Sequence, residues 1–106
     1  MAEVRVAVPP TARKGEVIEI KTLVSHPMDN GFLLDYGGRM IPRWIINRFE
    51  VEYNGEMVFS ADWHVSISTN PYLIFYTVAT ETGQLDFKWY DDNGEIYTHT
   101  AEITVT

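Results

Sequence analysis

Apolar and polar residues alternate with a period of two along most of this chain, and no other feature constrains its fold as strongly. At the start, Val4, Val6 and Val8 alternate with Arg5 and Ala7. Successive side chains of a β-strand point to opposite faces, so this pattern predicts an all-β fold rather than amphipathic helices. The same alternation recurs within residues 16–25, 48–53, 57–63, 85–89 and 97–105.

Turn signals separate the alternating segments. Asn54-Gly55 lies between two of them and is the strongest short signal for a β-hairpin. Asp91-Asp92-Asn93-Gly94 resembles part of a calcium-binding loop but lacks the acidic spacing of such a loop. It therefore predicts the turn of a second hairpin. About seven short antiparallel strands in a chain of 106 residues predict one immunoglobulin-like β-sandwich domain, spanning residues 1–106.

Several segments carry more apolar side chains than one small sandwich is expected to bury. Residues 72–79 are apolar on both faces, which is typical of a strand that is covered on both sides. Residues 26–42 form a long irregular loop that contains the consecutive residues Phe32-Leu33-Leu34, and Trp44-Ile45-Ile46 follows it. A protein partner explains this surplus, and loops folded back over the sheet are the alternative.

Composition argues against several classes of function. The net charge of −7 opposes binding to nucleic acid or to an anionic membrane. The longest apolar run, residues 72–79, has under half of the roughly 20 residues that a membrane-spanning helix needs. Without cysteine the chain has no disulfide, thiolate metal site or thiol nucleophile. It contains no phosphate-loop or dinucleotide-binding motif, and we assign it no cofactor.

Histidines are the main candidates for a chemical site. Asp62 and His64 lie two positions apart on one strand face, where they either hold a metal or lie exposed at the strand end. His99 shares the inner face of the last strand and is expected to be a peripheral core residue. His26 opens the long loop and is the best functional candidate of the three. One hypothesis is therefore a small histidine-based metal-binding or redox protein on an immunoglobulin-like scaffold.

Three of the eight basic residues, Arg39, Arg43 and Arg48, fall within one short stretch around Trp44. They are either solvated loop residues or the contacts of an anion or a carboxylate. Exposed arginines without a fixed partner contribute little free energy to folding or binding, so we favour the interpretation as solvated loop residues.

The order of short motifs along the chain resembles the Z subunit of SoxYZ, the carrier of the Sox sulfur-oxidation system. No single motif is diagnostic, but their number and order are typical of that family and cover essentially the whole chain. The matching segments are Lys14-Gly15-Glu16-Val17-Ile18-Glu19-Ile20-Lys21-Thr22-Leu23, Ser25-His26-Pro27-Met28, Ile41-Pro42-Arg43, Ile45-Ile46-Asn47-Arg48-Phe49, Tyr53-Asn54-Gly55, Val58-Phe59-Ser60-Ala61-Asp62, Asn70-Pro71-Tyr72, Ala79-Thr80-Glu81 and Ala101-Glu102-Ile103-Thr104-Val105.

The resemblance implies a non-catalytic subunit of a heterodimeric sulfur carrier in thiosulfate oxidation. In the family, a SoxY-like partner holds covalent sulfur intermediates on a C-terminal cysteine while other Sox enzymes act on them in turn. A cysteine-free chain fits the supporting role. The resemblance also implies a periplasmic location reached by export with the partner, and the first residues here lack the order of a signal peptide. The isolated chain is expected to form homodimers, because an exposed apolar face seeks cover.

We expect a partner interface in this chain rather than catalytic, cofactor-binding or metal-binding residues. Phe32-Leu33-Leu34-Asp35-Tyr36 is more apolar than the loop expected of the family and indicates a lineage-specific contact. The interface candidates are His26, Pro27, Met28, Phe32, Leu33, Leu34, Arg43, Trp44, Ile45, Ile46, Asn70, Pro71 and Tyr72.

Overall fold

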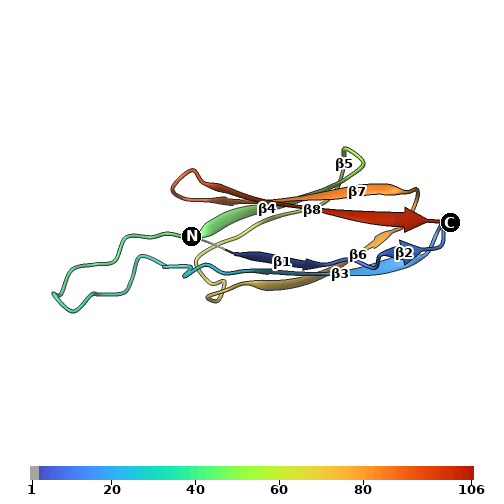
Figure 1. Cartoon of the computed structure of the whole chain (residues 1–106). Helices are drawn as coiled ribbons and strands as arrows, with labels where there is room; N and C mark the ends of the chain where they lie inside the picture. Colours follow the sequence, from blue (N-terminus) through green and yellow to red (C-terminus); the bar gives the residue numbers. More distant parts are fainter. Residues whose placement is uncertain (1–2) are drawn as a thin grey trace.

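The computed structural model describes residues 3–106, which form eight β-strands (Figure 1). Nowhere in these residues is there a helix long and apolar enough to cross a membrane. The strands are β1 (Val4–Ala7), β2 (Thr11–Ala12), β3 (Val17–Val24), β4 (Ile46–Tyr53), β5 (Glu56–Asp62), β6 (Tyr72–Val78), β7 (Gly83–Asp91) and β8 (Ile96–Val105).

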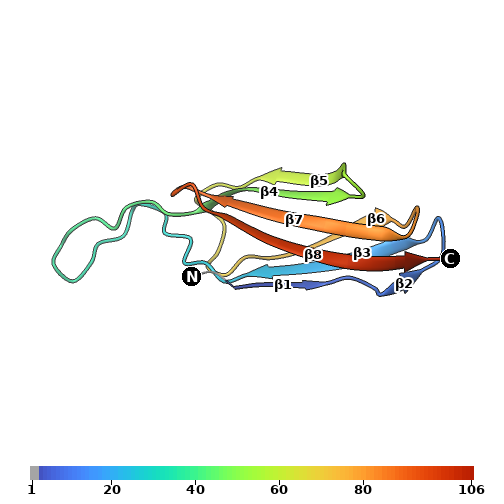
Figure 2. The same cartoon turned by 45° about the horizontal axis from the view of Figure 1, so that its top comes forward.

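The strands form two sheets that face each other (Figures 1 and 2). One sheet has three strands in the order β1-β3-β6, and the other has five in the order β2-β8-β7-β4-β5. All neighbouring strands are antiparallel except β2 and β8, which are parallel. The predicted all-β, immunoglobulin-like sandwich is confirmed.

The structure has one strand more than the sequence predicted. Thr11 and Ala12, which lie outside the alternating segments, form β2 and pair with Thr104 and Val105 of β8. A strand of two residues is too short to show alternation, so a sequence pattern cannot reveal it.

The core lies between the sheets and is built from inward positions that the alternation predicted. In β3, Ile18, Ile20 and Val24 are buried, whereas Val17 and Glu19 are exposed. Burying one such aliphatic or aromatic side chain stabilises a fold by about 1.5–3 kcal/mol. The largest fully buried side chains of the opposite sheet are Ile46, Phe49 and Val51 of β4, Leu85, Phe87 and Trp89 of β7, and Ile103 of β8.

Both predicted hairpins are present. Asn54 and Gly55 join β4 to β5 with φ angles of 49° and 83°, the positive values that a two-residue hairpin turn requires at both positions. The second turn joins β7 to β8 and is closed by a hydrogen bond of 3.0 Å from the Asp91 N–H to the Glu95 carbonyl.

A β-bulge interrupts the pairing of β4 with β5. Val51 lies opposite Phe59 and Glu52 opposite Met57, so Val58 is an extra residue without a partner of its own. The bulge turns Met57 outward, where it is 46% exposed. This corrects the expectation that Met57 shares the inner face of Phe59.

Residues 29–44 form a narrow projection, here called the finger, that extends beyond the end of both sheets (Figure 2). Its base is held by the pairing of Asp29 with Trp44 and its outer part by the pairing of Leu34 with Met40. The long loop expected from the sequence therefore has a defined, hairpin-like course.

Candidate partner-binding surfaces

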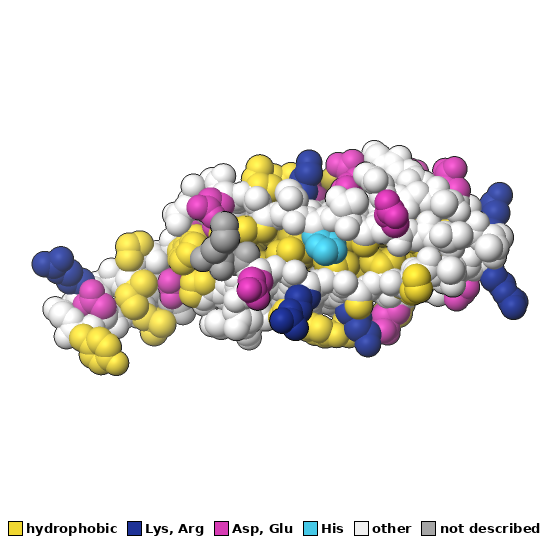
Figure 3. Space-filling model, in the orientation of Figure 1, with side chains coloured by type: hydrophobic (Ala, Val, Ile, Leu, Met, Phe, Trp, Pro, Cys, Tyr) yellow, Lys and Arg dark blue, Asp and Glu magenta, His cyan; other side chains and the backbone are white. Residues whose placement is uncertain are grey.

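Most of the large apolar side chains that remain exposed fall into two groups. One lies on the outer side of the three-stranded sheet, and the other lies on the finger, where Figure 3 shows hydrophobic side chains at the left. Exposed apolar clusters of this kind mark interaction sites. The first group is Val17, Tyr72, Ile74, Tyr76 and Val78, and the second is Phe32, Leu33, Leu34, Tyr36 and Met40.

Strand β6 supplies most of the first group. Its inward residue Phe75 is 5% exposed, and Leu73 and Thr77 beside it are half-buried. Its outward residues are 40–62% exposed. The sequence predicted that both apolar sides of this strand are covered, but the described residues cover only the inward side. The four outward side chains, called the β6 face below, are Tyr72, Ile74, Tyr76 and Val78.

Charged residues border the β6 face along the neighbouring strand β3. Glu19 lies opposite Tyr76, and Lys21 lies opposite Ile74. The Tyr76 hydroxyl donates a hydrogen bond of 3.1 Å to Glu19, which raises the pKa of Tyr76 above its usual value. Lys21 Nζ lies 3.5 Å from the Glu19 carboxylate. The apolar surface therefore runs mainly along β6, which is one of the two outer strands of its sheet.

A tight turn orders the tip of the finger. The Asp35 carboxylate accepts hydrogen bonds from the backbone N–H groups of Gly37 at 2.8 Å and Arg39 at 3.0 Å. The Asp35 N–H donates to the Arg39 carbonyl at 2.8 Å. Tyr36 is fully exposed within this turn. An ordered apolar tip loses less conformational entropy on binding than a flexible one does, which suits it to a protein contact.

His26 lies at the base of the finger and is 2% exposed. Its Nδ1 accepts a hydrogen bond of 3.1 Å from the Met28 N–H, which assigns the ring proton to Nε2. Nε2 has no hydrogen-bond partner and lies 3.7 Å from Asp91 Oδ2. Burial lowers the pKa of His26 below its usual 6.5 despite the attraction of Asp91, so the ring is neutral at pH 7 and this contact is not an ion pair.

Asp91 connects the finger to strands β7 and β8. Its Oδ2 accepts hydrogen bonds from Trp44 Nε1 at 2.9 Å and from the Tyr97 hydroxyl at 2.5 Å. Its Oδ1 accepts from the backbone N–H groups of Asn93 and Glu95. Burial raises the pKa of Asp91, but these hydrogen bonds together outweigh burial and leave the pKa below its usual value. Asp91 is therefore a charged, buried acceptor at pH 7.

A pocket of about 670 Å³ opens beside this cluster. Nε2 of His26 and the Asp91 carboxylate are buried, and Trp44 and Tyr97 bond to that carboxylate, so the cluster fixes the base of the finger rather than presenting reactive groups to solvent. The residues around the pocket are Ser25, His26, Pro27, Trp44, Asn70, Glu95 and Tyr97.

Two of the three clustered arginines contact carboxylates of the same chain. Arg43 donates from Nε and Nη2 to the two oxygens of Asp92 at 2.9 and 2.8 Å. Arg48 donates to Glu50 at 2.9 Å and to Asp62 at 2.8 Å. Both arginines thus form partly exposed ion pairs within their own chain, and a contact with an anion or with a carboxylate of another molecule stays a prediction.

The structure divides the thirteen interface candidates by exposure. The buried residues support the core and the base of the finger, and the contact of the exposed residues with a partner stays a prediction. Sequence reasoning did not list Ile74, Tyr76 and Val78 as interface candidates, although the second apolar face of this strand was the signal that pointed to them. The buried candidates are His26, Met28, Ile45, Ile46 and Pro71, Trp44 is half-buried, and the exposed candidates are Pro27, Phe32, Leu33, Leu34, Arg43, Asn70 and Tyr72.

The three histidines do not form a metal site. Among residues 3–106, no group of three or more His, Cys, Asp or Glu side chains is arranged to hold a metal ion. His64 is exposed just after β5, and His99 is half-buried with its ring centroid 6.2 Å from that of Phe87. The structure thus contradicts the hypothesis of a metal centre built from His26, His64 and His99.

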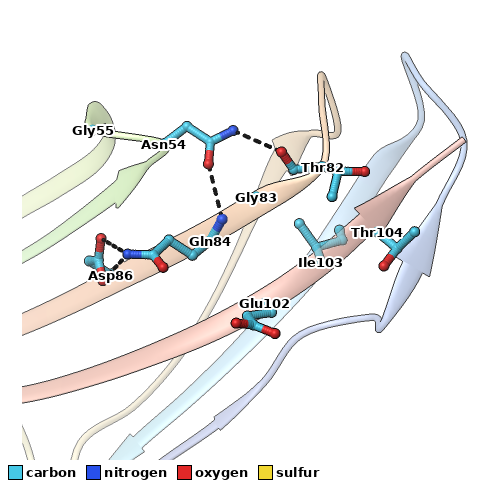
Figure 4. A pocket seen from close by; sticks show the side chains of 9 residues that line it. All are labelled: Asn54, Gly55, Thr82, Gly83, Gln84, Asp86, Glu102, Ile103 and Thr104. Carbon is cyan, nitrogen blue, oxygen red and sulfur yellow. Dashed lines mark hydrogen bonds between the residues drawn. The ribbon is translucent and has the colours of Figure 1, made fainter.

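An open pocket of about 760 Å³ lies near the other end of the sandwich, beside the turn between β4 and β5 (Figure 4). Asn54 Oδ1 accepts a hydrogen bond of 3.0 Å from the Gln84 N–H, and Asn54 Nδ2 donates to the Thr82 carbonyl at 3.4 Å. The Gln84 amide donates to Asp86 at 3.3 Å. These groups satisfy one another, so the pocket is a product of local turn structure.

The fold and its exposed surfaces define an immunoglobulin-like β-sandwich suited to contacts with other proteins. The sequence model of the family described as "Sulphur oxidation protein SoxZ" matches residues 4–102. The chain belongs to the SoxZ family. No protein with a curated description matches it.

Solved structures with the same fold come from two functional groups. Superoxide reductase (neelaredoxin) from Ignicoccus hospitalis is 14% identical with a TM-score of 0.73, covering 97% of this chain and 80% of that chain. A putative superoxide reductase from Thermotoga maritima has the same identity and TM-score and is covered over 85% of its length. The sulfur carrier protein SoxY from Chlorobium limicola f thiosulfatophilum is 16% identical with a TM-score of 0.65, covering 97% of this chain and 78% of that chain. At these identities the likeness shows a shared fold alone.

Proposed function

We propose that this chain is the non-catalytic subunit of a heterodimeric sulfur carrier in thiosulfate oxidation. The observation that carries the proposal is the SoxZ family match over residues 4–102. In this carrier a SoxY-like subunit holds the sulfur intermediates on a C-terminal cysteine, and the present chain supports that subunit. Other Sox enzymes meet the complex transiently.

The division of roles follows from sulfur chemistry. Covalent sulfur transfer of this kind needs a thiolate, and these 106 residues contain no cysteine. His26 is buried and neutral, and Asp91 is occupied by four hydrogen bonds, so neither offers a nucleophile or a general base to a substrate. The reacting sulfur is therefore assigned to the partner.

The exposed apolar surfaces support a stable partner. Burying apolar surface gains about 25 cal/mol per Å², and the finger and the β6 face each present several large side chains for burial. The same surfaces favour association of the chain with itself when the partner is missing, so we propose homodimers for the isolated chain.

We also propose a periplasmic location, reached by export together with the SoxY-like subunit. Only the resemblance to the family supports this step. Cell fractionation of a strain whose SoxY-like subunit lacks its signal peptide tests it. Retention of both subunits in the cytoplasm is the expected result, and periplasmic recovery of this chain alone contradicts it.

Purification of the tagged chain from its native host, followed by intact mass spectrometry, tests the carrier function. We expect a co-eluting subunit that carries sulfur-mass adducts on a C-terminal cysteine when cells grow on thiosulfate. Deletion of the gene should abolish thiosulfate oxidation, and a copy of the gene should restore it. A chain that elutes alone, together with unaltered thiosulfate oxidation after deletion, contradicts the proposal.

A further inference from the structure

The two sheets end in four edge strands. Strands β1 and β6 are the outer strands of the three-stranded sheet, and β2 and β5 are those of the other sheet. An edge strand presents unpaired backbone groups that can pair with a strand of another chain, and natural proteins usually block such edges. The four edges differ in this respect.

Three of the four edges carry features that block pairing. Strand β1 has four residues and is followed by Pro9 and Pro10. Strand β2 has only two residues and pairs with Thr104 and Val105 alone, so residues 96–103 of β8 are open beside it, and this stretch carries the exposed, charged Glu102. Strand β5 contains the bulge at Val58 and has Glu56 and Asp62 at its ends. Short length, proline, bulges and charge all discourage the addition of a strand.

Strand β6 has none of these features. Its seven residues, Tyr-Leu-Ile-Phe-Tyr-Thr-Val, include no charged residue and no proline. Pairing with β3 continues without a register shift over all seven. Regular strands that are rich in aromatic and β-branched residues and carry no charge pair readily with further strands.

The backbone of β6 shows which groups are free. At one end the Pro71 carbonyl accepts a hydrogen bond of 3.2 Å from the Val24 N–H, and at the other the Ala79 N–H donates to the Glu16 carbonyl at 2.8 Å. Hydrogen bonding to an antiparallel neighbour alternates along a strand, so odd-numbered residues bond to β3. The N–H and C=O groups of the even-numbered residues point away from β3. These residues are Tyr72, Ile74, Tyr76 and Val78.

The free backbone groups and the exposed apolar side chains thus belong to the same four residues. In residues 3–106, these four make no backbone hydrogen bond outside the strand ladders. Only an extended segment can satisfy a row of alternating donors and acceptors while its side chains cover an apolar strip.

We propose that β6 pairs with an edge strand of the SoxY-like partner, so that the three-stranded sheet continues into the partner's sheet. This inference rests on the proposed function and adds the surface through which the subunits meet. A solved SoxY has the same open sandwich fold, which offers edge strands of its own. Because the β6 edge is uncharged, the complementary strand presents apolar side chains to Tyr72, Ile74, Tyr76 and Val78.

Replacing Ile74 by proline tests the contact at the centre of the β6 face, where it also removes an apolar side chain. Ile74→Pro removes an N–H group that faces the open edge and leaves the hydrogen bonds to β3 in place. Ser60→Pro is the matched control on β5. The Trp63 N–H donates to the Asn47 carbonyl of β4, so odd-numbered residues of β5 after the bulge bond to β4. The N–H of Ser60 therefore points to an open edge, as that of Ile74 does. The affinity of each variant for the purified SoxY-like subunit is measured by calorimetric titration.

We expect Ile74→Pro to raise the Kd at least about tenfold and Ser60→Pro to change it by less than about twofold. Hydrogen exchange of the unmodified heterodimer gives a second readout that needs no variant. The peptide covering β6 should exchange more slowly in the complex than in the dilute monomer, and the β5 peptide should not. Equal affinities for both variants, or unprotected β6 amides in an intact heterodimer, overturn the inference and leave the proposed function standing. Absence of any heterodimer overturns both.

Discussion

Nε2 of His26 lies 3.7 Å from Oδ2 of Asp91, and both side chains are at least 95% buried. The Trp44 ring packs edge-on against His26 with ring centroids 4.6 Å apart, and its Nε1 donates to Asp91. Neutral imidazole, charged carboxylate and indole thus join the finger to the end of the five-stranded sheet. The two hydrogen bonds of Arg43 to Asp92 add a second connection between the finger and the same turn.

Replacing Asp91 by asparagine should destabilise the fold strongly. The asparagine amide has one acceptor oxygen where Asp91 has two. The NH₂ group would therefore point at N–H or O–H donors that now bind the carboxylate. We expect a loss of about 2–4 kcal/mol in the free energy of unfolding, measured by urea denaturation. Asp62→Asn, which alters an exposed contact with Arg48, is the control and should cost less than about 1 kcal/mol. Equal losses for both variants would contradict the role of Asp91.

Stability should fall when the pH drops below 6.5, because of His26. Its pKa is lowered in the folded protein by burial, so between the folded pKa and the unfolded value of 6.5 the unfolded chain binds more protons. The contribution of His26 is therefore complete above pH 6.5 and is lost as the pH falls through the folded pKa. The neighbouring carboxylates of Asp91, Asp29 and Asp92 attract the protonated ring, which raises the pKa of His26 and opposes the loss.

His26→Asn is the control for this pH effect, because the Asn Oδ1 can replace Nδ1 as acceptor for the Met28 N–H and does not titrate. Urea denaturation of both proteins between pH 5 and 7.5 measures the difference. The wild-type stability should decline more steeply with acid than that of the variant. Identical pH slopes, or an NMR titration of His26 with a pKa above 6.5, would refute the prediction.

Alternation predicted the inward residues of β3, β4 and β7 because a strand packed against a second sheet has one face in water and one in the core. The same reasoning was incomplete for β6. Its pattern indicates that both faces are apolar, but a sequence cannot say whether the second face is covered by the same chain or by another one. Ile74 and Tyr76 were therefore missed as surface candidates, whereas Tyr72 was found through the family motif.

The role of His26 could not be predicted either, for a different reason. Its position at the start of a long loop favoured a functional group, yet its environment is set by Asp91, which lies at the far end of the chain in a segment predicted only as a turn. Long-range contacts of single polar residues leave no periodic signal. The turn itself was predicted correctly, because its chemistry is local.

Gly83 should tolerate no side chain while Asn54 is present. A Cβ atom added at Gly83 would clash with the Asn54 amide, so Gly83→Ala must displace the amide that bonds to Gln84 and Thr82. We expect a loss of about 1–3 kcal/mol in thermal or urea denaturation. Because Asn54 has a φ of 49°, Asn54→Gly fits its backbone, and the double variant should recover most of the loss caused by Gly83→Ala. Additive effects of the two substitutions would rule out this clash.

Polar substitutions on the finger should separate binding from folding. Phe32, Leu34 and Tyr36 are 74%, 63% and 112% exposed, so replacing all three by serine removes no core contact. The free energy of unfolding should change by less than about 1 kcal/mol. The Kd for the SoxY-like subunit should rise at least about tenfold, because large apolar groups on an ordered tip are typical binding hot spots.

Met57→Ser is the matched control for the finger variant. Met57 is an exposed apolar residue that belongs to neither the finger nor the β6 face, so its replacement should leave the Kd within about twofold of the wild-type value. Titration calorimetry measures both affinities under one condition. If the triple variant binds as tightly as the control, the finger does not contact the SoxY-like subunit, and its apolar tip serves a different contact. If the triple variant also unfolds at lower urea, the finger is part of the cooperative fold, contrary to its exposure.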